Sequence, residues 1–253
     1  MKRLENKIAV VTGASSGIGE ATAIRFAQEG ADLVICARRT DRLEQTAEKC
    51  RAYGVQCVVV TADVTIHADC TNVIKTAADT FGHIDILVNN AGIADKHRPI
   101  TECTDEWWDE VIAVDQTSCF YMTKDALPYM TGEKGGSIIN VSSIGGVFGS
   151  AGISYSTAKA GLLGFTKNVA IQFAPKGIRC NAVCPGPTPT ELNLPEKVKY
   201  FTTWFADQTA MHMNMTLPEA DVTDQANAIL YFASDESRAV TGQVLVVDHG
   251  TTL

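Results

Sequence analysis

A phenol and an ammonium group stand four residues apart in the segment Tyr155-Ser156-Thr157-Ala158-Lys159. On a helix, this spacing places both side chains on one face. Lowering the pKa of a phenol from ~10 to near neutrality requires about 4 kcal/mol. One ammonium ~4–5 Å away supplies that much at an effective dielectric constant of ~20. Such a pair can act as a general acid or base, although the same spacing also occurs by chance on many helices.

Two serines end the apolar run that precedes this helix, in Ile138-Ile139-Asn140-Val141-Ser142-Ser143. A hydroxyl at the carboxyl end of a strand lies where open α/β sheets bind ligands, and it could hold a carbonyl oxygen. Adjacent serines are also common in turns, so the two serines alone do not indicate a site.

A glycine-rich turn follows the first apolar run and opens the first amphipathic segment, with its glycines spaced as GxxxGxG. Phosphate binding requires close approach of the backbone, which glycine permits, together with N–H donors at the positive end of a helix. Tight strand–helix turns also favour glycine. In this context we expect a nucleotide to contact Gly13, Ser15, Ser16, Gly17, Ile18 and Gly19.

The residues after the second apolar run bear on the choice of nucleotide. In dinucleotide-binding folds an acidic residue there binds the ribose 2′-hydroxyl, whereas arginine accommodates a 2′-phosphate. This chain has no carboxylate at that point and carries Arg38 and Arg39 instead. Because guanidinium donors match phosphate geometry, we expect NADP(H) rather than NAD(H). The alternative is a pair of solvated arginines at a helix start.

Strand-like and helix-like segments alternate along the chain and would position these residues. Continuous Val/Ile/Leu runs are typical of parallel strands covered by helices on both faces. We expect strands at 8–12, 32–36, 56–61, 84–89, 136–142, 179–184 and 244–247. Helical patterns lie at 17–29, 41–53, 67–81, 106–130, 154–174 and 223–234. The alternation predicts an α/β fold with a doubly wound, mostly parallel sheet of Rossmann type, as a single domain over residues 1–253.

One region departs from this alternation. Residues 185–218 hold five of the eight prolines and contain no clean strand. A long irregular insert in a compact domain is usually functional, so we expect a substrate lid at about residues 187–217. It could instead be a partner-binding face or ordinary packing. The aromatic and methionine residues of this region are Tyr200, Phe201, Trp204, Phe205, Met211, Met213 and Met215.

Composition limits the partners and the cellular location. The 253 residues are 45% hydrophobic and 20% charged, which is typical of a globular protein. A net charge of −8 disfavours general binding to nucleic acid or to an anionic membrane. The sequence contains no run of membrane-spanning length and no signal peptide, so we expect a cytoplasmic protein. The cysteines and histidines have no zinc-site spacing, and no metal is expected.

Together with three further motifs, these features resemble the short-chain dehydrogenases/reductases. The further motifs are Asp63-Val64, Asn89-Asn90-Ala91-Gly92 and Pro185-Gly186, and all occur in the family's order between Lys7 and Gly250. The resemblance implies a single Rossmann-type domain in which a hydride passes between nicotinamide C4 and a substrate carbonyl or alcohol.

The resemblance also implies roles for individual residues. Tyr155 is the expected acid/base, Lys159 is expected to lower its pKa and to hold the nicotinamide ribose, and a strand-end serine is expected to orient the carbonyl oxygen. Further cofactor contacts are expected from Asp63, Val64, Asn90, Ala91, Gly92, Pro185, Gly186, Thr188 and Thr190. Members of the family usually form tetramers or dimers, so a homotetramer or homodimer is expected.

The chain departs from the family pattern at the catalytic residues. The family's usual asparagine, which supports a water relay to the lysine, falls on Asp115. A carboxylate can accept the same hydrogen bond, but its charge near Lys159 would weaken the lysine's effect on the tyrosine. The family's serine most often lies 13 residues before the tyrosine, at Ser142, yet strand context favours Ser143. Changing a turn's length is easier than flipping a side chain to the other face of the strand.

The sequence leaves the substrate open. Methionine and aromatic side chains in the lid suit a bulky hydrophobic alcohol or ketone, such as a steroid or bile acid. Lys197 and Lys199 would equally tolerate a carboxylated or acyl-carrier substrate, so a 3-oxoacyl reductase or a sugar/polyol dehydrogenase is an alternative. A non-catalytic NADP-binding regulator is the alternative from another class. The intact Tyr155/Lys159 pair argues against it, whereas Asp115 leaves some room for it.

Overall fold

The computed structural model describes residues 2–130, 135–191 and 201–253. Within these ranges, seven parallel strands form one sheet in the order β3-β2-β1-β4-β5-β6-β7. The strands are β1 (Ile8–Thr12), β2 (Asp32–Ala37), β3 (Cys57–Thr61), β4 (Ile86–Asn89), β5 (Gly136–Val141), β6 (Ile178–Pro185) and β7 (Val244–Val247). Their carboxyl ends all meet at one edge of the sheet, because every pair is parallel.

Helices connect the strands, and most of them pack against the faces of the sheet. They are α1 (Gly17–Gln28), α2 (Thr40–Arg51), α3 (His67–Phe81), α4 (Asp105–Ile112), α5 (Ser118–Met130), α6 (Ile144–Phe148), α7 (Ile153–Phe173), α9 (Thr203–Ala210) and α10 (Val222–Ala233). Short 3-10 turns occupy Ile100–Glu102, Ala174–Lys176 and Asp235–Ser237, and a π-helical turn, Ala113–Thr117, joins α4 to α5.

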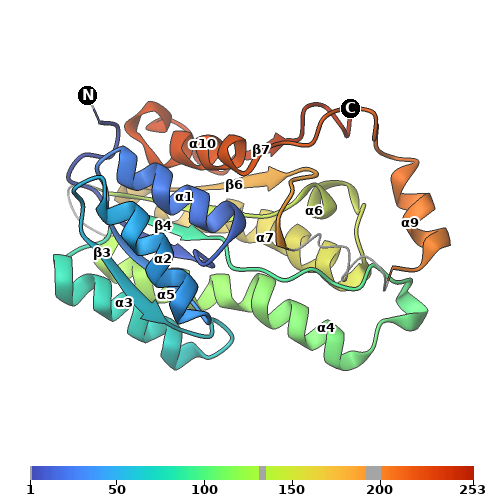
Figure 1. The fold of residues 1–253 in the computed structure, drawn as a ribbon, viewed down its shortest axis with the longest axis horizontal. Coiled ribbons are helices and arrows are strands. Elements are labelled where there is room, and N and C mark those ends of the chain that lie inside the picture. The colour runs from blue at the N-terminus through green and yellow to red at the C-terminus, as the bar shows by residue number, and fades with distance from the viewer. Residues whose placement is uncertain (1, 131–134, 192–200) are drawn as a thin grey trace.

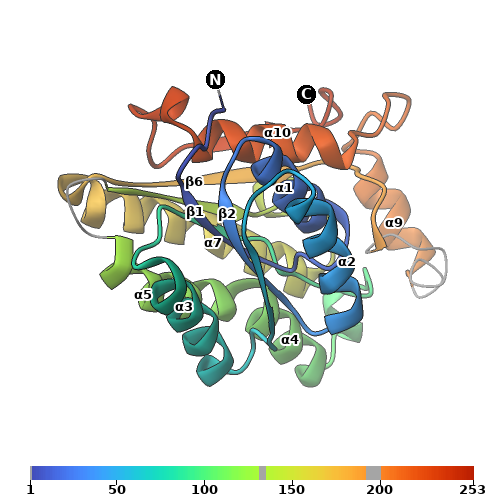
Figure 2. The same ribbon diagram turned by 60° about the vertical axis from the view of Figure 1, so that its left-hand side comes forward.

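Each face of the sheet is covered by its own helices (Figure 2). Alternate residues of β1 enter different cores, because successive side chains of a strand point to opposite faces. Val11 packs in one core with Phe26 of α1 and Leu230 of α10. Val10 packs in the other core, which also contains side chains from α3, α5 and α7. The expected doubly wound α/β sheet is therefore confirmed.

The strand order reverses between β1 and β4. The chain builds outward from β1 to β3 and then returns to place β4 on the other side of β1. Open α/β sheets bind ligands outside the carboxyl ends of the strands at such a switch point. The glycine-rich turn after β1 and the Asn90–Gly92 motif after β4 both lie at this point.

The structure differs from the expected elements in three places. The pattern at 106–130 is interrupted by the π-helical turn Ala113–Thr117, which holds Asp115. The short helices α6 and α9 were not expected, since five and eight residues are too few for a clear helical period. Helix α9 lies within the expected lid and stands apart from the sheet (Figure 1). Lys197, Lys199 and Tyr200 fall outside the described residues.

Within the described ranges, no helix has the combination of length and apolar character needed to cross a bilayer.

Candidate active site

Tyr155 and Lys159 lie in the first turns of α7, which begins at Ile153. The four-residue spacing brings them together, with the Lys159 Nζ 5.4 Å from the centre of the Tyr155 ring. The same Nζ donates to the carbonyl oxygen of Val141 at 3.1 Å. Lys159 thus ties the start of α7 to the carboxyl end of β5, where the sequence predicted the active site.

Asp115 forms a buried ion pair with Lys159. Its Oδ1 is 3.0 Å from the Lys159 Nζ, and the two side chains are 0% and 4% exposed. The other carboxylate oxygen accepts a hydrogen bond from the backbone N–H of Ile93 at 3.1 Å. Gly92 passes directly over the pair, since a Cβ there would lie 2.6 Å from Asp115 Oδ1. The chain after β4 therefore fits closely around this carboxylate.

Burial and the ion pair shift the pKa values of both Asp115 and Lys159. Burial raises the pKa of Asp115, and the nearby Lys159 opposes this rise only in part. Burial alone would lower the pKa of Lys159, but the Asp115 carboxylate, together with the Tyr155 phenol, raises that pKa above its ordinary value. Lys159 is consequently held as an ammonium.

The pKa of the Tyr155 phenol differs from the expectation of a lowered value. Burial raises it above its ordinary value, the charge of Lys159 opposes the rise, and the Asp115 carboxylate adds to it. A hydrogen bond with the Ser143 side chain also opposes the rise. Lys159 thus acts on the phenol in the expected direction, but burial, which is the largest cause, and the Asp115 carboxylate leave the pKa of Tyr155 above its ordinary value.

The two strand-end serines occupy different environments. Ser142 is buried, and its hydroxyl donates to the Lys159 carbonyl oxygen at 2.8 Å, which fixes α7 against β5. Ser143 directly precedes α6 as its N-cap. Its oxygen accepts from the Gly145 N–H at 3.0 Å, and its side chain also contacts Tyr155. The structure thus brings Ser143, rather than Ser142, to the phenol.

Asp95 is a site residue that the sequence did not reveal. Its Oδ2 accepts from the Tyr155 N–H at 3.2 Å and from the Ser154 hydroxyl at 3.4 Å. A carboxylate stabilises the N-terminus of a helix, so Asp95 fixes the first turn of α7 and with it the tyrosine. It lies in an irregular segment after β4, where neither periodicity nor spacing marks it.

The glycine-rich turn packs tightly against the end of β4. Gly13 has φ +67°, and a Cβ there would lie 2.8 Å from the Cα of Ala91. The Asn90 side chain donates to the Thr12 carbonyl oxygen at 2.9 Å, and the Ala91 N–H donates to the Thr12 hydroxyl at 3.0 Å. These bonds hold the carboxyl ends of β1 and β4 together.

The start of α1 fits the phosphates of a nicotinamide dinucleotide. The N–H groups of its first turn, at Gly17, Ile18 and Gly19, have no preceding helical carbonyl to bond. They lie at the positive end of the helix dipole. The Ser15 and Ser16 hydroxyls accept from Arg39 at 3.1 and 2.8 Å. Backbone donors, a helix terminus and a guanidinium therefore converge here.

The other predicted cofactor residues line the same edge of the sheet. Asp63 accepts hydrogen bonds from the Thr65 N–H and hydroxyl. These bonds lower the pKa of Asp63, and the charge of Arg38 lowers it further by a smaller amount. Val64 and Thr188 are buried, and Thr188 donates to the Gly186 carbonyl oxygen. Pro185 ends β6. Thr190 lies over the glycine-rich turn, with its Cγ2 3.3 Å from where a Cβ on Gly17 would be.

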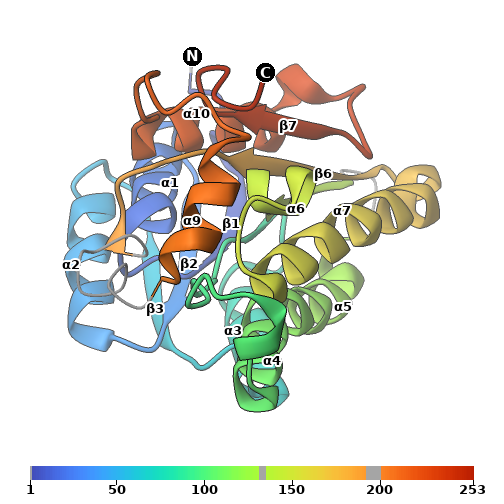
Figure 3. The ribbon, with the colours of Figure 1, turned by 90° about the vertical axis from the view of Figure 1, so that its right-hand side faces the viewer.

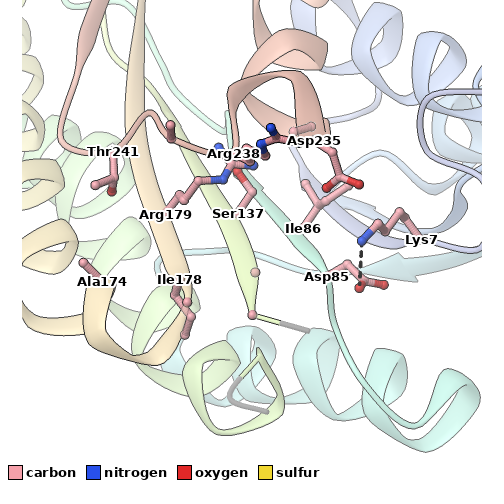
Figure 4. Close-up of a pocket in the computed structure, with 15 residues that line it drawn as sticks. Lys7, Asp85, Ile86, Ser137, Ala174, Ile178, Arg179, Asp235, Arg238 and Thr241 are labelled. Carbon is pink, nitrogen blue, oxygen red and sulfur yellow. Dashed lines mark ion pairs between the residues drawn. The ribbon is translucent and has the colours of Figure 1, made fainter. Parts of the chain in front are cut away.

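A cavity of about 310 Å³ lies at the opposite edge of the sheet (Figure 4). It is lined by the first residues of β4, β5 and β6, namely Ile86, Gly136 and Ile178, and is bordered by an ion pair of Lys7 with Asp85 at 3.8 Å. It thus lies at the other end of the strands from Tyr155 and Lys159. Within the described ranges, no cluster of three or more His, Cys, Asp or Glu side chains is placed to hold a metal ion.

Comparison with known proteins identifies the family. A family model described as Enoyl-(Acyl carrier protein) reductase matches residues 13–252. The 3-oxoacyl-[acyl-carrier-protein] reductase of Thermotoga maritima is 37% identical over 99% of this chain and 100% of that protein. The chain belongs to the short-chain dehydrogenase/reductase family. Members of this family are oxidoreductases that bind a nicotinamide cofactor.

Other short-chain dehydrogenases/reductases act on different compounds. The 3beta-hydroxysteroid dehydrogenase of Mediterraneibacter gnavus is 34% identical, covering 100% of this chain and 97% of that protein. The structure of carveol dehydrogenase from Mycobacterium avium in complex with NAD has a TM-score of 0.89 and 29% identity, over 99% of each chain. Membership in the family thus establishes alcohol/carbonyl chemistry and a nicotinamide cofactor, while its members differ in substrate.

Proposed function

We propose that this short-chain dehydrogenase/reductase transfers a hydride between NADP(H) and a carbonyl or secondary alcohol, with Tyr155 as the proton donor and acceptor. The observation that carries the proposal is the convergence of Tyr155, Lys159 and Ser143 beside the glycine-rich turn. An intact acid/base group with a charged lysine next to it favours catalysis over a non-catalytic NADP-binding regulator.

The residues of the site have separate tasks in this reaction. When bound, the nicotinamide supplies or accepts the hydride. In carbonyl reduction, the Tyr155 hydroxyl donates its proton to the carbonyl oxygen, which the Ser143 hydroxyl orients. The Lys159 ammonium stabilises the phenolate that remains, and Asp115 holds the ammonium in place. In alcohol oxidation the phenolate accepts the proton instead.

The choice of NADP(H) rests on the residues after β2. The absence of an acidic residue there and the guanidiniums of Arg38 and Arg39 favour a ribose that carries a 2′-phosphate. Arg39 already bonds the hydroxyls of Ser15 and Ser16, so it is positioned beside the glycine-rich turn.

A bulky hydrophobic substrate, such as a steroid or bile acid, is the substrate class that the lid favours. The His97 ring lies 4.8 Å from the Phe201 ring and 4.9 Å from the Phe205 ring, and bonds the Thr209 hydroxyl of α9 at 3.0 Å. These contacts attach α9 to the segment after β4, next to Asp95. The exposed Trp204 and Met211 then offer apolar surface at the lid. The relatives named above leave a 3-oxoacyl reductase as the alternative.

We also propose that the protein forms a homodimer or homotetramer and that it is located in the cytoplasm. Helices α4 and α5 carry the exposed aromatic residues Trp108, Phe120 and Tyr129. Burial of such side chains between copies would contribute to a homodimer or homotetramer.

A substrate panel tests the proposal. We expect NADPH to be consumed with 3-keto or 7-keto steroids, and at a higher kcat/KM than NADH with the same ketone. Absorbance of the reduced nicotinamide measures both, with polyols and 3-oxoacyl thioesters as the comparison classes. Preference for a thioester would favour the acyl reductase instead, and absence of turnover with every class would contradict an enzymatic function.

A further inference from the structure

Two arginines at the start of α2 hold a single carboxylate. Arg39 directly precedes α2, and Arg42 lies three residues further, on the same side of the helix start. The Arg39 Nη1 donates to Glu191 Oε2 at 2.7 Å, and Arg42 donates to the other oxygen, Oε1. Each carboxylate oxygen is thus bound by a different guanidinium.

The surroundings of this carboxylate are those of a phosphate site. Arg39 also bonds the hydroxyls of Ser15 and Ser16 in the glycine-rich turn. Two guanidiniums therefore bind one anion, and one of them also bonds the glycine-rich turn. Guanidinium donors bind phosphate and carboxylate with similar geometry. Hydrogen bonds from Arg39 and Arg42 lower the pKa of Glu191 to about 2, so its carboxylate remains charged at every pH near neutrality.

Glu191 reaches this position from the carboxyl edge of the sheet. The chain leaves the carboxyl end of β6 and crosses toward α2 (Figure 3). On the way, the Thr190 methyl group lies against Gly17 of the glycine-rich turn. Glu191 consequently joins two segments far apart in sequence, at the place where a 2′-phosphate on Arg39 would lie.

We propose that the Glu191 carboxylate competes with the 2′-phosphate of NADP(H) for Arg39 and Arg42. The 2′-phosphate binds these two guanidiniums by displacing the Glu191 carboxylate. The inference rests on the proposed function, because it concerns that function's cofactor. Two anions on the same pair of guanidiniums would repel each other. Glu191 therefore weakens binding of the phosphorylated cofactor and leaves binding of the unphosphorylated one unchanged.

Calorimetric titration of the purified protein with 2′,5′-ADP and with 5′-AMP, which lacks only the 2′-phosphate, tests this without turnover. Replacement of Glu191 by glutamine (Glu191→Gln) removes two exposed ion pairs and should tighten 2′,5′-ADP binding about three- to tenfold. The affinity for 5′-AMP should stay the same. The gain should shrink at ~1 M salt, where the Debye length is only ~3 Å. Arg42→Gln should weaken 2′,5′-ADP binding alone.

Glu44→Gln is the matched control, because Glu44 is an exposed glutamate of α2 that pairs with Arg51. It removes the same charge and should leave both affinities unchanged. Unfolding temperatures confirm that the variants are folded. An equal gain for both ligands, a gain of the same size in Glu44→Gln, or weaker 2′,5′-ADP binding in Glu191→Gln would each overturn the inference.

The wild-type titrations separate this inference from the proposed cofactor. If wild-type protein prefers 2′,5′-ADP and Glu191→Gln changes nothing, the inference fails and the NADP(H) proposal stands. If wild-type protein has no preference but Glu191→Gln creates one, the inference stands and the wild-type preference for NADP(H) is wrong. If neither protein distinguishes the ligands, both proposals fail.

Discussion

Replacing Tyr155 with phenylalanine lowers kcat for ketone reduction by about 10²–10⁴-fold, the usual contribution of a positioned general acid. The substitution removes the hydroxyl that meets Ser143 and keeps the ring beside Lys159. The variant should still bind NADPH, as measured by the fluorescence of NADPH, because the glycine-rich turn and Arg39 are unchanged. The measurement is single-turnover oxidation of NADPH with the best ketone of the panel.

Tyr231→Phe provides the matched control, since Tyr231 is exposed on α10. This variant should keep full activity. If Tyr155→Phe retained turnover close to that of the control, another group would be donating the proton, and the assignment of Tyr155 would be incorrect.

Replacing Lys159 with methionine is expected to damage both activity and stability. It removes the charge that stabilises the Tyr155 phenolate, so kcat should fall by at least ~10²-fold. It also leaves the Asp115 carboxylate buried without its cation, and breaking one side of a buried ion pair costs about 3–5 kcal/mol. Urea unfolding at neutral pH measures this loss in the free energy of unfolding.

The double variant Lys159→Met/Asp115→Asn separates the two effects. Neutralising both partners removes the unpaired buried charge, so most of the lost stability should return. Activity should not return, because the ammonium is still missing. Wild-type stability in the Lys159→Met single variant would show that Asp115 is not the partner that the structure places at 3.0 Å.

The sheet and the position of the site follow from features that are local in sequence. Apolar runs of strand length alternate with amphipathic windows, and parallel pairing then brings every strand's carboxyl end to one edge. The sequence alone therefore predicts that the turn after β1, the motif after β4 and the serines after β5 lie at the same edge of the sheet. The spacing of Tyr155 and Lys159 likewise predicted their shared face on α7.

The remaining features depend on contacts between distant segments. The π-helical turn that aims Asp115 at Lys159 interrupts a continuous helical pattern, which has no proline or glycine at that point. Asp95 reaches the start of α7 from an irregular segment. Glu191 meets Arg39 and Arg42 across about 150 residues of chain. The one available signal was the spacing of Arg42 three residues after Arg39.

Burial is the main reason why the pKa of the Tyr155 phenol is raised despite the charged lysine next to it, and the Asp115 carboxylate adds to the rise. The carboxylate keeps Lys159 protonated and in place, and it also partly cancels the field that the ammonium exerts on Tyr155. The ion pair thus holds the lysine firmly, and it also reduces the lysine's lowering effect on the pKa of the phenol. An asparagine would accept a hydrogen bond without adding charge.

The pH dependence of alcohol oxidation in the Asp115→Asn variant tests this account most directly. Oxidation requires the Tyr155 phenolate, so the rate rises as pH increases through the pKa of that phenol. Because the Asp115 carboxylate raises this pKa, its neutralisation should move the rising limb of kcat to lower pH than in the wild type. Asp109→Asn, at an exposed position of α4, should leave the limb in place. A limb that stays in place in Asp115→Asn, or moves to higher pH, would contradict the central claim that Asp115 controls the lysine's effect on the tyrosine.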